Sequence, residues 1–411
     1  MGVVLLIGTL DTKGREMRYL MDEIRALGGE PLVADVGVFG PMTTHVPIAY
    51  TAQDIAEAGG ESLAALRTGG ETGGARAHAM SVMTNGLSAI LRRENEAGRF
   101  DAVLGFGGSS GSSVIGAAMQ VLPVGVPKVL VSTMASGDTT PYVGTRDITL
   151  MYSVTDIAGL NRISRVVLRN AARAAVGMAS GPLADNAADQ PLIAITMFGV
   201  TTPCVMAVQQ QIEEDGFETT VFHATGSGGR AMEDLVRDGL VDGVIDLTTS
   251  ELTDEFVGGV LTAGPTRMEA AGLAGIPQVL VPGALEVINF GAEPTVPTRF
   301  RVPERMLHVH NAAVTIVRTL PEEARRLGEI FAQKASVATG PTAVVLPLKG
   351  LSALDAPGQP WENPVGNAQL FDAIRSGLRE DIPIIEVDAA INDPAFADAC
   401  VAAFRDLWAN R

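Results

Sequence analysis

The stretch GFGGSSGSS, residues 105–113, places four glycines and four serines around a single phenylalanine. Gly107 and Gly108 have no Cβ atom and tolerate positive φ angles, so consecutive backbone N–H groups can converge on an anion. Ser109 and the serines after it can cap a helix and donate from their hydroxyl groups, and Gly111 completes this run of small residues. These residue types predict a binding site for a phosphate or a carboxylate. The alternative is a close-packed turn between a strand and a helix.

A second donor-rich stretch, TLDTKG at residues 9–14, follows the apolar run VVLLIG. The hydroxyl groups of Thr9 and Thr12 and the first amides of the next helix could face a phosphate, with Lys13 balancing its charge. In the other interpretation, Asp11 or Thr12 caps the helix and Lys13 is solvated. One residue can serve both purposes, so both interpretations stay open.

Two further strand ends add candidates for the same pocket. Asp35, at the end of PLVADVG, occupies the position where Rossmann-type units often place an acceptor for ribose. The stretch STMASGD offers hydroxyl and backbone donors after another strand. No G-x-G-x-x-G pattern follows the first strand, and GGSSGSS lacks the lysine of a Walker A motif, so we expect neither a dinucleotide fingerprint nor a P-loop. The candidates in STMASGD are Ser132, Thr133, Ser136 and Gly137.

The second half of the chain carries its own polar strand ends. The loop HATGSGGR again combines glycines with hydroxyl groups before a helix. His308 and His310 would point to the same face of a strand, but without a third ligand nearby we predict no metal site. The candidate catalytic acid–base residues are His223, Glu286 and Lys349. A small-molecule site would be lined by residues 223–230, 286–289, 308–311 and 349–361.

These loops separate apolar strand-length runs from segments with helical periodicity. Continuous runs such as VVLLIG are typical of parallel strands that are covered on both faces. Repeated strand–helix–strand units predict an α/β protein with two Rossmann-like lobes, each a mostly parallel doubly wound sheet. The segment 178–191 is rich in Ala, Asp, Gly and Pro and is the expected linker. We therefore predict lobes at 1–182 and 190–411, with a ligand cleft between them.

Charge and composition exclude several functional classes. The net charge of −17 argues against a nucleic-acid partner. The one dense basic segment places four arginines between 162 and 173 on one face of a helix, which is either a solvated or interface face or an anion-facing stripe. No apolar run is long enough to span a membrane, and the two cysteines, Cys204 and Cys400, suit a reducing compartment. We expect a soluble cytoplasmic protein.

Five motifs in order resemble the Tm-one-like ATP-binding family of bacterial, fungal and plant proteins: GTLDTKG, GFGGSSGSS, GTRDITLMYSVTDIAGLNRIS, FHATGSGGRAMEDL and PLKGLSALDAPGQP. The resemblance runs nearly end to end. It implies two Rossmann-like lobes, a homodimer or higher homo-oligomer, and ATP binding in the N-terminal lobe. By motif position, the implied nucleotide role falls on Thr9, Asp11, Gly107, Gly108, Ser109 and Gly111.

The sequence thus predicts a nucleotide site for ATP, accompanied by Mg²⁺ with Asp11 or Asp138 as a candidate ligand. The expected reaction is an ATP-dependent transfer or ligation on a small carboxylate or sugar acid. A non-catalytic nucleotide-binding regulatory module is one alternative. The other is a nucleotide-independent sugar-acid isomerase or hydrolase that uses His223 and Glu286 as its acid–base pair.

Overall fold

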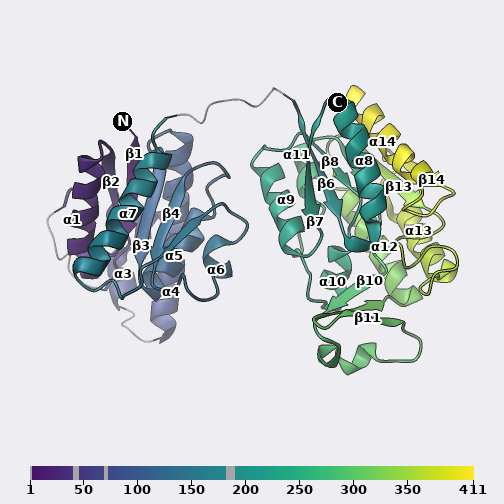
Figure 1. Cartoon of the computed structure of the whole chain (residues 1–411), viewed down its shortest axis with the longest axis horizontal. Helices are drawn as coiled ribbons and strands as arrows, with labels where there is room; N and C mark the ends of the chain where they lie inside the picture. The colour runs from purple at the N-terminus through teal and green to yellow at the C-terminus, as the bar shows by residue number, and fades with distance from the viewer. Residues whose placement is uncertain (1, 40–45, 69–72, 182–189) are drawn as a thin grey trace. The chain divides into compact units, whose positions relative to one another are not determined.

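The chain folds into two compact units, Met1–Asn186 and Ala187–Arg411, each with its own central parallel sheet (Figure 1). The predicted linker, 178–191, falls largely on residues 182–189, which lie outside the described residues. The prediction of two α/β lobes with mostly parallel sheets is confirmed. The computed structural model describes residues 2–39, 46–68, 73–181 and 190–411.

The first unit, unit 1, contains a five-stranded sheet, sheet A, in the order β2-β1-β3-β4-β5. All of its paired strands run parallel. The chain winds from β1 to β2 on one side and then to β3 on the other, so the topological switch point lies between β1 and β3. The strands are β1 (Val3–Gly8), β2 (Glu30–Asp35), β3 (Ala102–Gly107), β4 (Lys128–Ser132) and β5 (Thr149–Tyr152).

Helices cover both faces of sheet A because its strands are apolar on both faces. Leu5 and Ile7 of β1 pack toward α2, α4 and α5, whereas Val4 and Leu6 pack toward α1 and α7. The alternation follows from the two-residue period of a strand. The helices are α1 (Leu10–Ala26), α2 (Ala52–Ala58), α3 (Leu63–Thr68), α4 (Gly73–Glu96), α5 (Ser109–Met119), α6 (Thr140–Val143) and α7 (Arg162–Met178).

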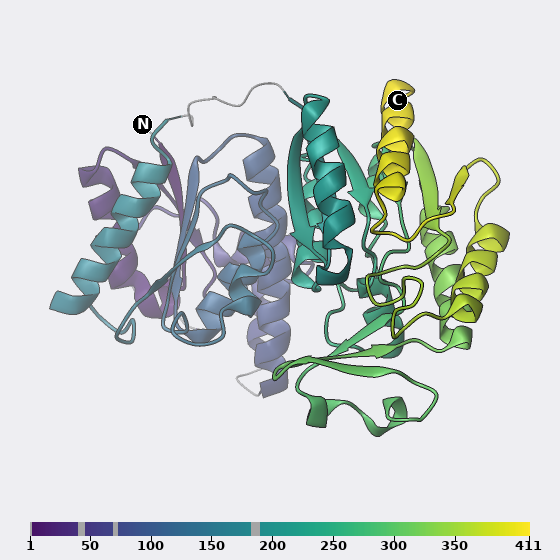
Figure 2. The same cartoon turned by 45° about the vertical axis from the view of Figure 1, so that its right-hand side comes forward.

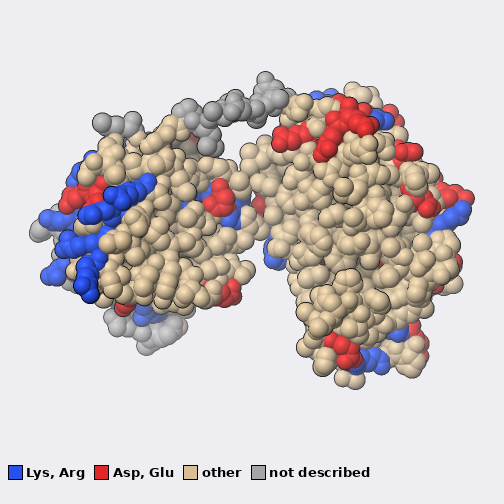
Figure 3. Space-filling view, viewed as in Figure 1, with Lys and Arg blue, Asp and Glu red and all other residues tan. Residues whose placement is uncertain are grey.

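The predicted arginine row lies on the solvent side of α7. Figure 3 shows basic side chains gathered over α1 and α7. Arg169 forms two hydrogen bonds of 3.0 Å with the carboxylate of Glu23 on α1. The guanidinium of Arg165 lies 5.5 Å from the centre of the Tyr19 ring, also on α1. These two arginines therefore help to hold the two helices together.

The second unit, unit 2, contains a six-stranded parallel sheet, sheet B, in the order β14-β13-β9-β8-β6-β7. Its winding begins as in sheet A: β7 lies on one side of β6 and β8 on the other. The switch point of sheet B therefore lies between β6 and β8. The strands are β6 (Leu192–Met197), β7 (Glu218–His223), β8 (Gly243–Asp246), β9 (Gln278–Leu280), β13 (Thr342–Pro347) and β14 (Ile384–Val387).

The helices of unit 2 also form two layers. Helices α8 and α14 share one buried cluster with sheet B, and α9, α11, α12 and α13 pack in clusters on the other face. No helix among the described residues is long and apolar enough to cross a membrane. The helices are α8 (Thr202–Glu214), α9 (Ser227–Arg237), α10 (Glu251–Val257), α11 (Ala270–Ala274), α12 (Pro321–Ala335), α13 (Pro364–Gly377) and α14 (Pro394–Ala409).

A small antiparallel sheet, in the order β10-β12-β11, lies beyond the carboxyl ends of sheet B (Figures 1 and 2). Its strands are β10 (Val287–Phe290), β11 (Leu307–Asn311) and β12 (Val314–Arg318). Strand β10 includes residues 287–289 of the predicted small-molecule lining. The buried Asn289 belongs to this strand, where its backbone N–H donates to Asp254.

Candidate functional site

A pocket of about 580 Å³ opens in unit 1 at the carboxyl ends of its central strands. Loops that follow β1, β2, β3 and β4 all contribute to its wall. The pocket therefore straddles the switch point between β1 and β3, where doubly wound sheets usually bind ligands. Its polar lining residues are Thr9, Asp11, Thr12, Lys13, Arg76, Gly108, Ser109, Ser110, Gly111, Thr133 and Asp156. Its apolar lining residues are Val36, Val38, Phe39, Ala79, Met80, Met83, Val114 and Met134.

The start of α5 presents backbone donors to this pocket. Gly108 is the N-cap residue and supplies no side-chain cap. The first amides of a helix have no acceptor within the helix, so those of Ser109, Ser110 and Gly111 are available to a ligand. Gly107 must be small: a Cβ atom there would lie 2.9 Å from the backbone nitrogen of Ser112. This loop can therefore approach an anion with its backbone.

The β4 loop contributes one predicted residue to the lining and another to the support behind it. Thr133 lines the pocket. Ser132 is fully buried, and its Oγ accepts a hydrogen bond of 2.7 Å from Ser112 of α5. Ser132 therefore ties the β4 loop to α5 from behind. Ser136 and Gly137 are exposed and are not among the lining residues.

The start of α1 brings four predicted residues to the pocket. Thr9 is the N-cap residue of this helix and makes no side-chain cap, so the prediction that Asp11 or Thr12 caps it was wrong. The hydroxyl groups of Thr9 and Thr12 are 3.1 Å apart. Lys13 is not simply solvated, because its ammonium group donates to the carbonyl of Ile157 at 2.5 Å. Asp11 has a buried Oδ1 without a hydrogen-bond partner in the described structure. A hydrogen-bond acceptor, Asp11, and a cation, Lys13, thus lie two residues apart in the wall of this pocket.

Asp35 lies beneath the pocket rather than in its lining. It is 8% exposed, and its Oδ1 accepts hydrogen bonds of 2.9 Å from the backbone amides of Leu10 and Gly37. Burial raises the pKa of Asp35, although these two hydrogen bonds oppose the shift. The carboxylate of Asp35 therefore links the segments that follow β1 and β2. Asp35 is not among the residues that line the pocket, so this geometry does not support the predicted contact with a ribose.

Sequence reasoning missed the contribution of α4. Ala79, Met80 and Met83 of this helix form much of the apolar wall, and Arg76 reaches the start of α5. Its Nη2 donates to the Ser110 hydroxyl at 2.9 Å. The spacing of these residues marks one helix face. An apolar helix face usually packs in a core, so the pattern alone offers no reason to assign it to a pocket.

The three acid–base candidates of unit 2 lie in different environments. His223 is exposed at the end of β7, with its ring 5.7 Å from that of Phe198. Lys349 forms an exposed ion pair of 2.8 Å with Asp388. Glu286 directly precedes β10 and is buried. The structure does not bring these residues together as one catalytic group.

Glu286 is enclosed in the interior of unit 2, where it is 2% exposed. It lies near Asp355, which accepts a hydrogen bond of 2.8 Å from Arg318. The Ser352 hydroxyl is nearby, but neither carboxyl oxygen of Glu286 accepts a hydrogen bond of normal geometry from the described residues. Burial, and then the charge of Asp355, raise the pKa of Glu286 to about 7. This environment favours the protonated form of Glu286 more than water does, and the side chain is enclosed by the described residues rather than open to solvent.

The histidine pair lies on the exposed outer strand of the small sheet. The rings of His308 and His310 have centres 6.4 Å apart. Among the described residues, no group of three or more His, Cys, Asp or Glu side chains is arranged to hold a metal ion.

The second glycine-rich loop, HATGSGGR, binds a carboxylate side chain of unit 2 through its backbone amides. The carboxylate of Glu251 accepts hydrogen bonds from the amides of Gly226 and Gly229, at 2.6 and 3.1 Å. Its other oxygen accepts a hydrogen bond of 2.6 Å from Arg267. A Cβ atom on Gly229 would lie 2.0 Å from this carboxylate. The loop therefore does bind an anion, but the anion is a side chain.

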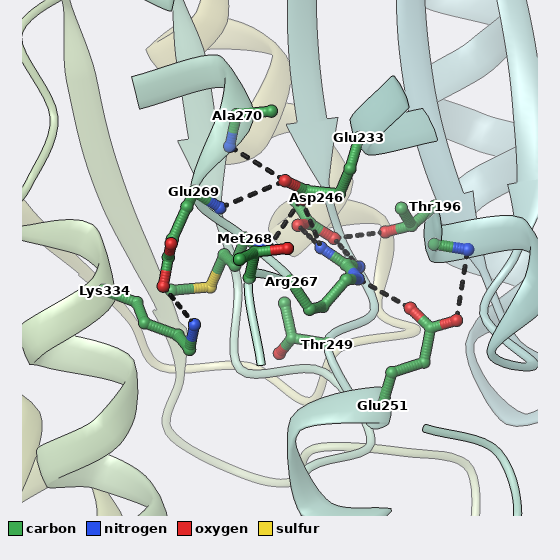
Figure 4. Close-up of polar contacts among 12 residues, drawn as sticks. Thr196, Glu233, Asp246, Thr249, Glu251, Arg267, Met268, Glu269, Ala270 and Lys334 are labelled. Carbon is green, nitrogen blue, oxygen red and sulfur yellow. Dashed lines mark hydrogen bonds and ion pairs between the residues drawn. The ribbon is translucent and has the colours of Figure 1, made fainter. Parts of the chain in front are cut away.

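Arg267 is fully buried at the carboxyl ends of β6 and β8 (Figure 4). Two of its nitrogens contact Asp246, at 2.5 and 2.8 Å, and Asp246 in turn accepts a hydrogen bond from Thr196. Burial alone would lower the pKa of Arg267, but the charge and hydrogen bonds of Asp246, together with Glu251, raise it well above its ordinary value. This network fills the switch point of sheet B.

Comparison with protein families and relatives gives consistent matches over both units. The N-terminal and C-terminal domain models of an uncharacterised protein family, UPF0261, match residues 2–184 and 190–408. A UPF0261 protein of Clostridium tetani is 45% identical over 397 residues, 96% of each chain. The ToMV resistance protein Tm-1(GCR237) of Solanum lycopersicum is 38% identical over 430 residues, which cover 98% of this chain and 55% of the tomato protein.

Two of the solved structures that align with this chain are distant matches. The Streptomyces glycosyltransferase SsfS6, complexed with thymidine diphosphate, aligns over 98% of this chain and 99% of its own, with 15% identity and a TM-score of 0.22. The UDP-N-acetylglucosamine 2-epimerase from Rickettsia bellii aligns over 68% of this chain and 78% of its own, with 11% identity and a TM-score of 0.23. TM-scores this low do not establish a shared fold.

Proposed function

We propose that this chain, which belongs to the uncharacterised protein family UPF0261, is a nucleotide-binding protein that takes ATP in the pocket of unit 1. The observation that carries the proposal is the uncapped start of α5, which opens into a cavity at the switch point of sheet A. Helix amides at such a position favour a phosphate group through hydrogen bonds and the helix dipole.

The pocket has both apolar and polar lining residues, a combination that suits a nucleotide. Val38, Phe39 and Met80 offer an apolar surface for a base. The start of α5, with Lys13 and Arg76 nearby, offers donors and positive charge for phosphates. A volume of about 580 Å³ lies within the range of roughly 300–1,000 Å³ that is usual for small-molecule sites.

The carboxylates of the pocket fit a divalent cation that accompanies the phosphates. Asp11 has a buried oxygen without a partner among the described residues, and Asp156 also lines the pocket. Mg²⁺ is commonly held by one or two carboxylates together with substrate phosphates, whose charge it neutralises. Asp138 is a poorer candidate, because it is exposed outside the lining and accepts a hydrogen bond from the Thr140 amide.

A phosphoryl or nucleotidyl transfer to a small carboxylate or sugar acid is the reaction that such a site would support. Catalysis of this kind depends mainly on positioning and on stabilising negative charge, which the α5 amides, Lys13 and Arg76 are placed to do. Consumption of ATP only when a candidate acid is present would support this reaction. ATP binding without turnover, in the presence of such acids, would favour the regulatory module.

Binding is tested first, with Gly108→Val as the key variant. At Gly108, φ is −77° and a Cβ atom would have no neighbour within 4 Å, so valine should fit the empty protein while it blocks the anion seat. A Cβ atom on the exposed Gly177 of α7 would also have no neighbour within 4 Å, and Gly177→Val is the matched control.

Hydrogen–deuterium exchange with and without ATP, ADP and Mg²⁺ reports on unit 1 directly. At a ligand concentration 100 times Kd, binding should stabilise the native unit by about 2.7 kcal/mol and slow exchange in 9–14 and 105–113. Gly177→Val should keep this protection and Gly108→Val should lose it. If millimolar ATP protects neither segment in the unmodified chain, the proposed function is wrong.

A further inference from the structure

One face of α4 lines the pocket with a row of side chains that changes from basic to apolar along the helix. Arg76, Met80 and Met83 line the pocket at spacings of four and three residues, which places them on one face of the helix. At a rise of 1.5 Å per residue, the row extends over about 10 Å along the helix axis. Both methionines are apolar lining residues, and Met83 belongs to a buried cluster against which Met80 and Phe39 pack. The guanidinium group of Arg76 contacts Ser110, at the start of α5.

The two cations that line the pocket are held differently. The ammonium group of Lys13 donates to a backbone carbonyl, that of Ile157, at 2.5 Å. Arg76 is exposed, and it donates to the neutral hydroxyl of Ser110 at 2.9 Å. A guanidinium has five N–H donors in a planar fork, and this hydrogen bond uses one of them. Arg76 can therefore keep its contact with α5 and still bind an anion.

We propose that Arg76 makes the pocket selective for nucleoside di- and triphosphates over monophosphates, an inference that rests on the proposed function. With a base against Met80 and Met83, the row on α4 leads from the base toward the phosphate end. The α5 amides receive the first phosphate and Arg76 contacts the outer ones. Paired hydrogen bonds between guanidinium and phosphate are charge-assisted and strong. A ligand that ends at its first phosphate gains little from Arg76.

Calorimetric titration of adenosine, AMP, ADP and ATP into the full chain, at one fixed salt concentration, tests this selectivity. The variants are Arg76→Gln, which removes the charge, and Arg76→Lys, which keeps it without the planar fork. The matched control is Arg92→Gln, since Arg92 is exposed on the same helix and outside the pocket lining.

In the unmodified chain we expect ATP to bind at least tenfold more tightly than AMP. Arg76→Gln should weaken ATP binding at least tenfold and change AMP binding by less than twofold. Arg76→Lys should be intermediate, and Arg92→Gln should match the unmodified chain. These outcomes together support the inference.

Two results would overturn the inference while nucleotide binding itself stands. One is an ATP-to-AMP affinity ratio that Arg76→Gln leaves unchanged. The other is an equal loss of ATP affinity in Arg76→Gln and Arg92→Gln, which would reveal a general charge effect. If no adenosine nucleotide binds the unmodified chain, the proposed function fails and this inference fails with it.

Discussion

Replacement of Glu286 by glutamine should make the stability of unit 2 less dependent on pH. Glu286 is enclosed beside Asp355, and burial followed by the charge of Asp355 raises its pKa to about 7 from an ordinary value of 4.5. The folded unit therefore binds a proton at Glu286 more tightly than the unfolded chain does. For such a group, stability is highest below the unfolded pKa and is lost as the pH rises toward the folded pKa.

The size of the effect follows from the two pKa values. A difference of about 2.5 units corresponds to about 3 kcal/mol at 1.36 kcal/mol per unit. Some of this loss has already occurred at pH 5, so between pH 5 and pH 8 Glu286 should lower the free energy of unfolding by about 2 to 3 kcal/mol. Glu286→Gln should reduce the pH-dependent loss by this amount. Any constant cost of burying the amide cancels in the comparison between the two pH values.

Tryptophan fluorescence during urea denaturation can follow unit 2 alone. The only two tryptophans of the chain, Trp361 and Trp408, both belong to unit 2. Trp361 is buried and packs in one cluster with Ala284 and Val287, on either side of Glu286. Urea titrations of the unmodified chain and of Glu286→Gln, each at pH 5 and at pH 8, give four free energies of unfolding. Each one is obtained from the midpoint and the slope of its denaturation curve.

The matched control is Glu304→Gln, because Glu304 is an exposed carboxylate in the same unit. It should show the same pH dependence as the unmodified chain. A parallel pH dependence in Glu286→Gln and in the unmodified chain would refute the reasoning, since Glu286 would then have the same proton affinity in the folded and unfolded states.

Two further substitutions test the buried ion pairs of Arg267 and the close packing at Gly107. Arg267→Met should lower the free energy of unfolding of unit 2 by about 3–5 kcal/mol, because Asp246 and Glu251 would remain buried without their cation. A loss below 1 kcal/mol in the same urea titration would contradict this prediction. Gly107→Ala should destabilise unit 1 by about 1–3 kcal/mol, because its Cβ atom would lie 2.9 Å from the nitrogen of Ser112. Faster hydrogen exchange in 105–113 would confirm the second prediction, and unchanged exchange would contradict it.

The sequence predicted the central strands well because they are continuous apolar runs. Strand β1, for example, is buried almost throughout and can lie only inside a covered sheet. Strands β5 and β11 gave no such signal, because both are edge strands with little buried surface. Strand β5 is half-exposed, and β11 is largely exposed, so neither has the apolar pattern from which a strand is recognised.

Prediction of the pocket was limited by two facts that a sequence does not contain. The first is which way a strand-end residue turns: Thr133 faces the pocket and Ser132, its neighbour, faces the interior. The second is which distant helix covers the strand ends. Arg76 and Met80 reach the pocket only because α4 packs beside α5, and nothing in their local pattern distinguishes them from an ordinary helix face.

The two switch points show why a glycine-rich loop is insufficient evidence for a ligand site. In unit 2, the amides of Gly226 and Gly229 receive the carboxylate of Glu251, and Arg267 balances its charge within the same core. In unit 1, the corresponding question is whether an internal acid reaches the amides at the start of α5. Arg76 donates to the hydroxyl of Ser110 at the start of α5, so the charged side chain in contact with this residue is a cation, and the N-terminal amides of a helix favour an anion. The positive charge that contacts Ser110, rather than the glycine content of the loop, therefore supports the proposal of an external phosphate in unit 1.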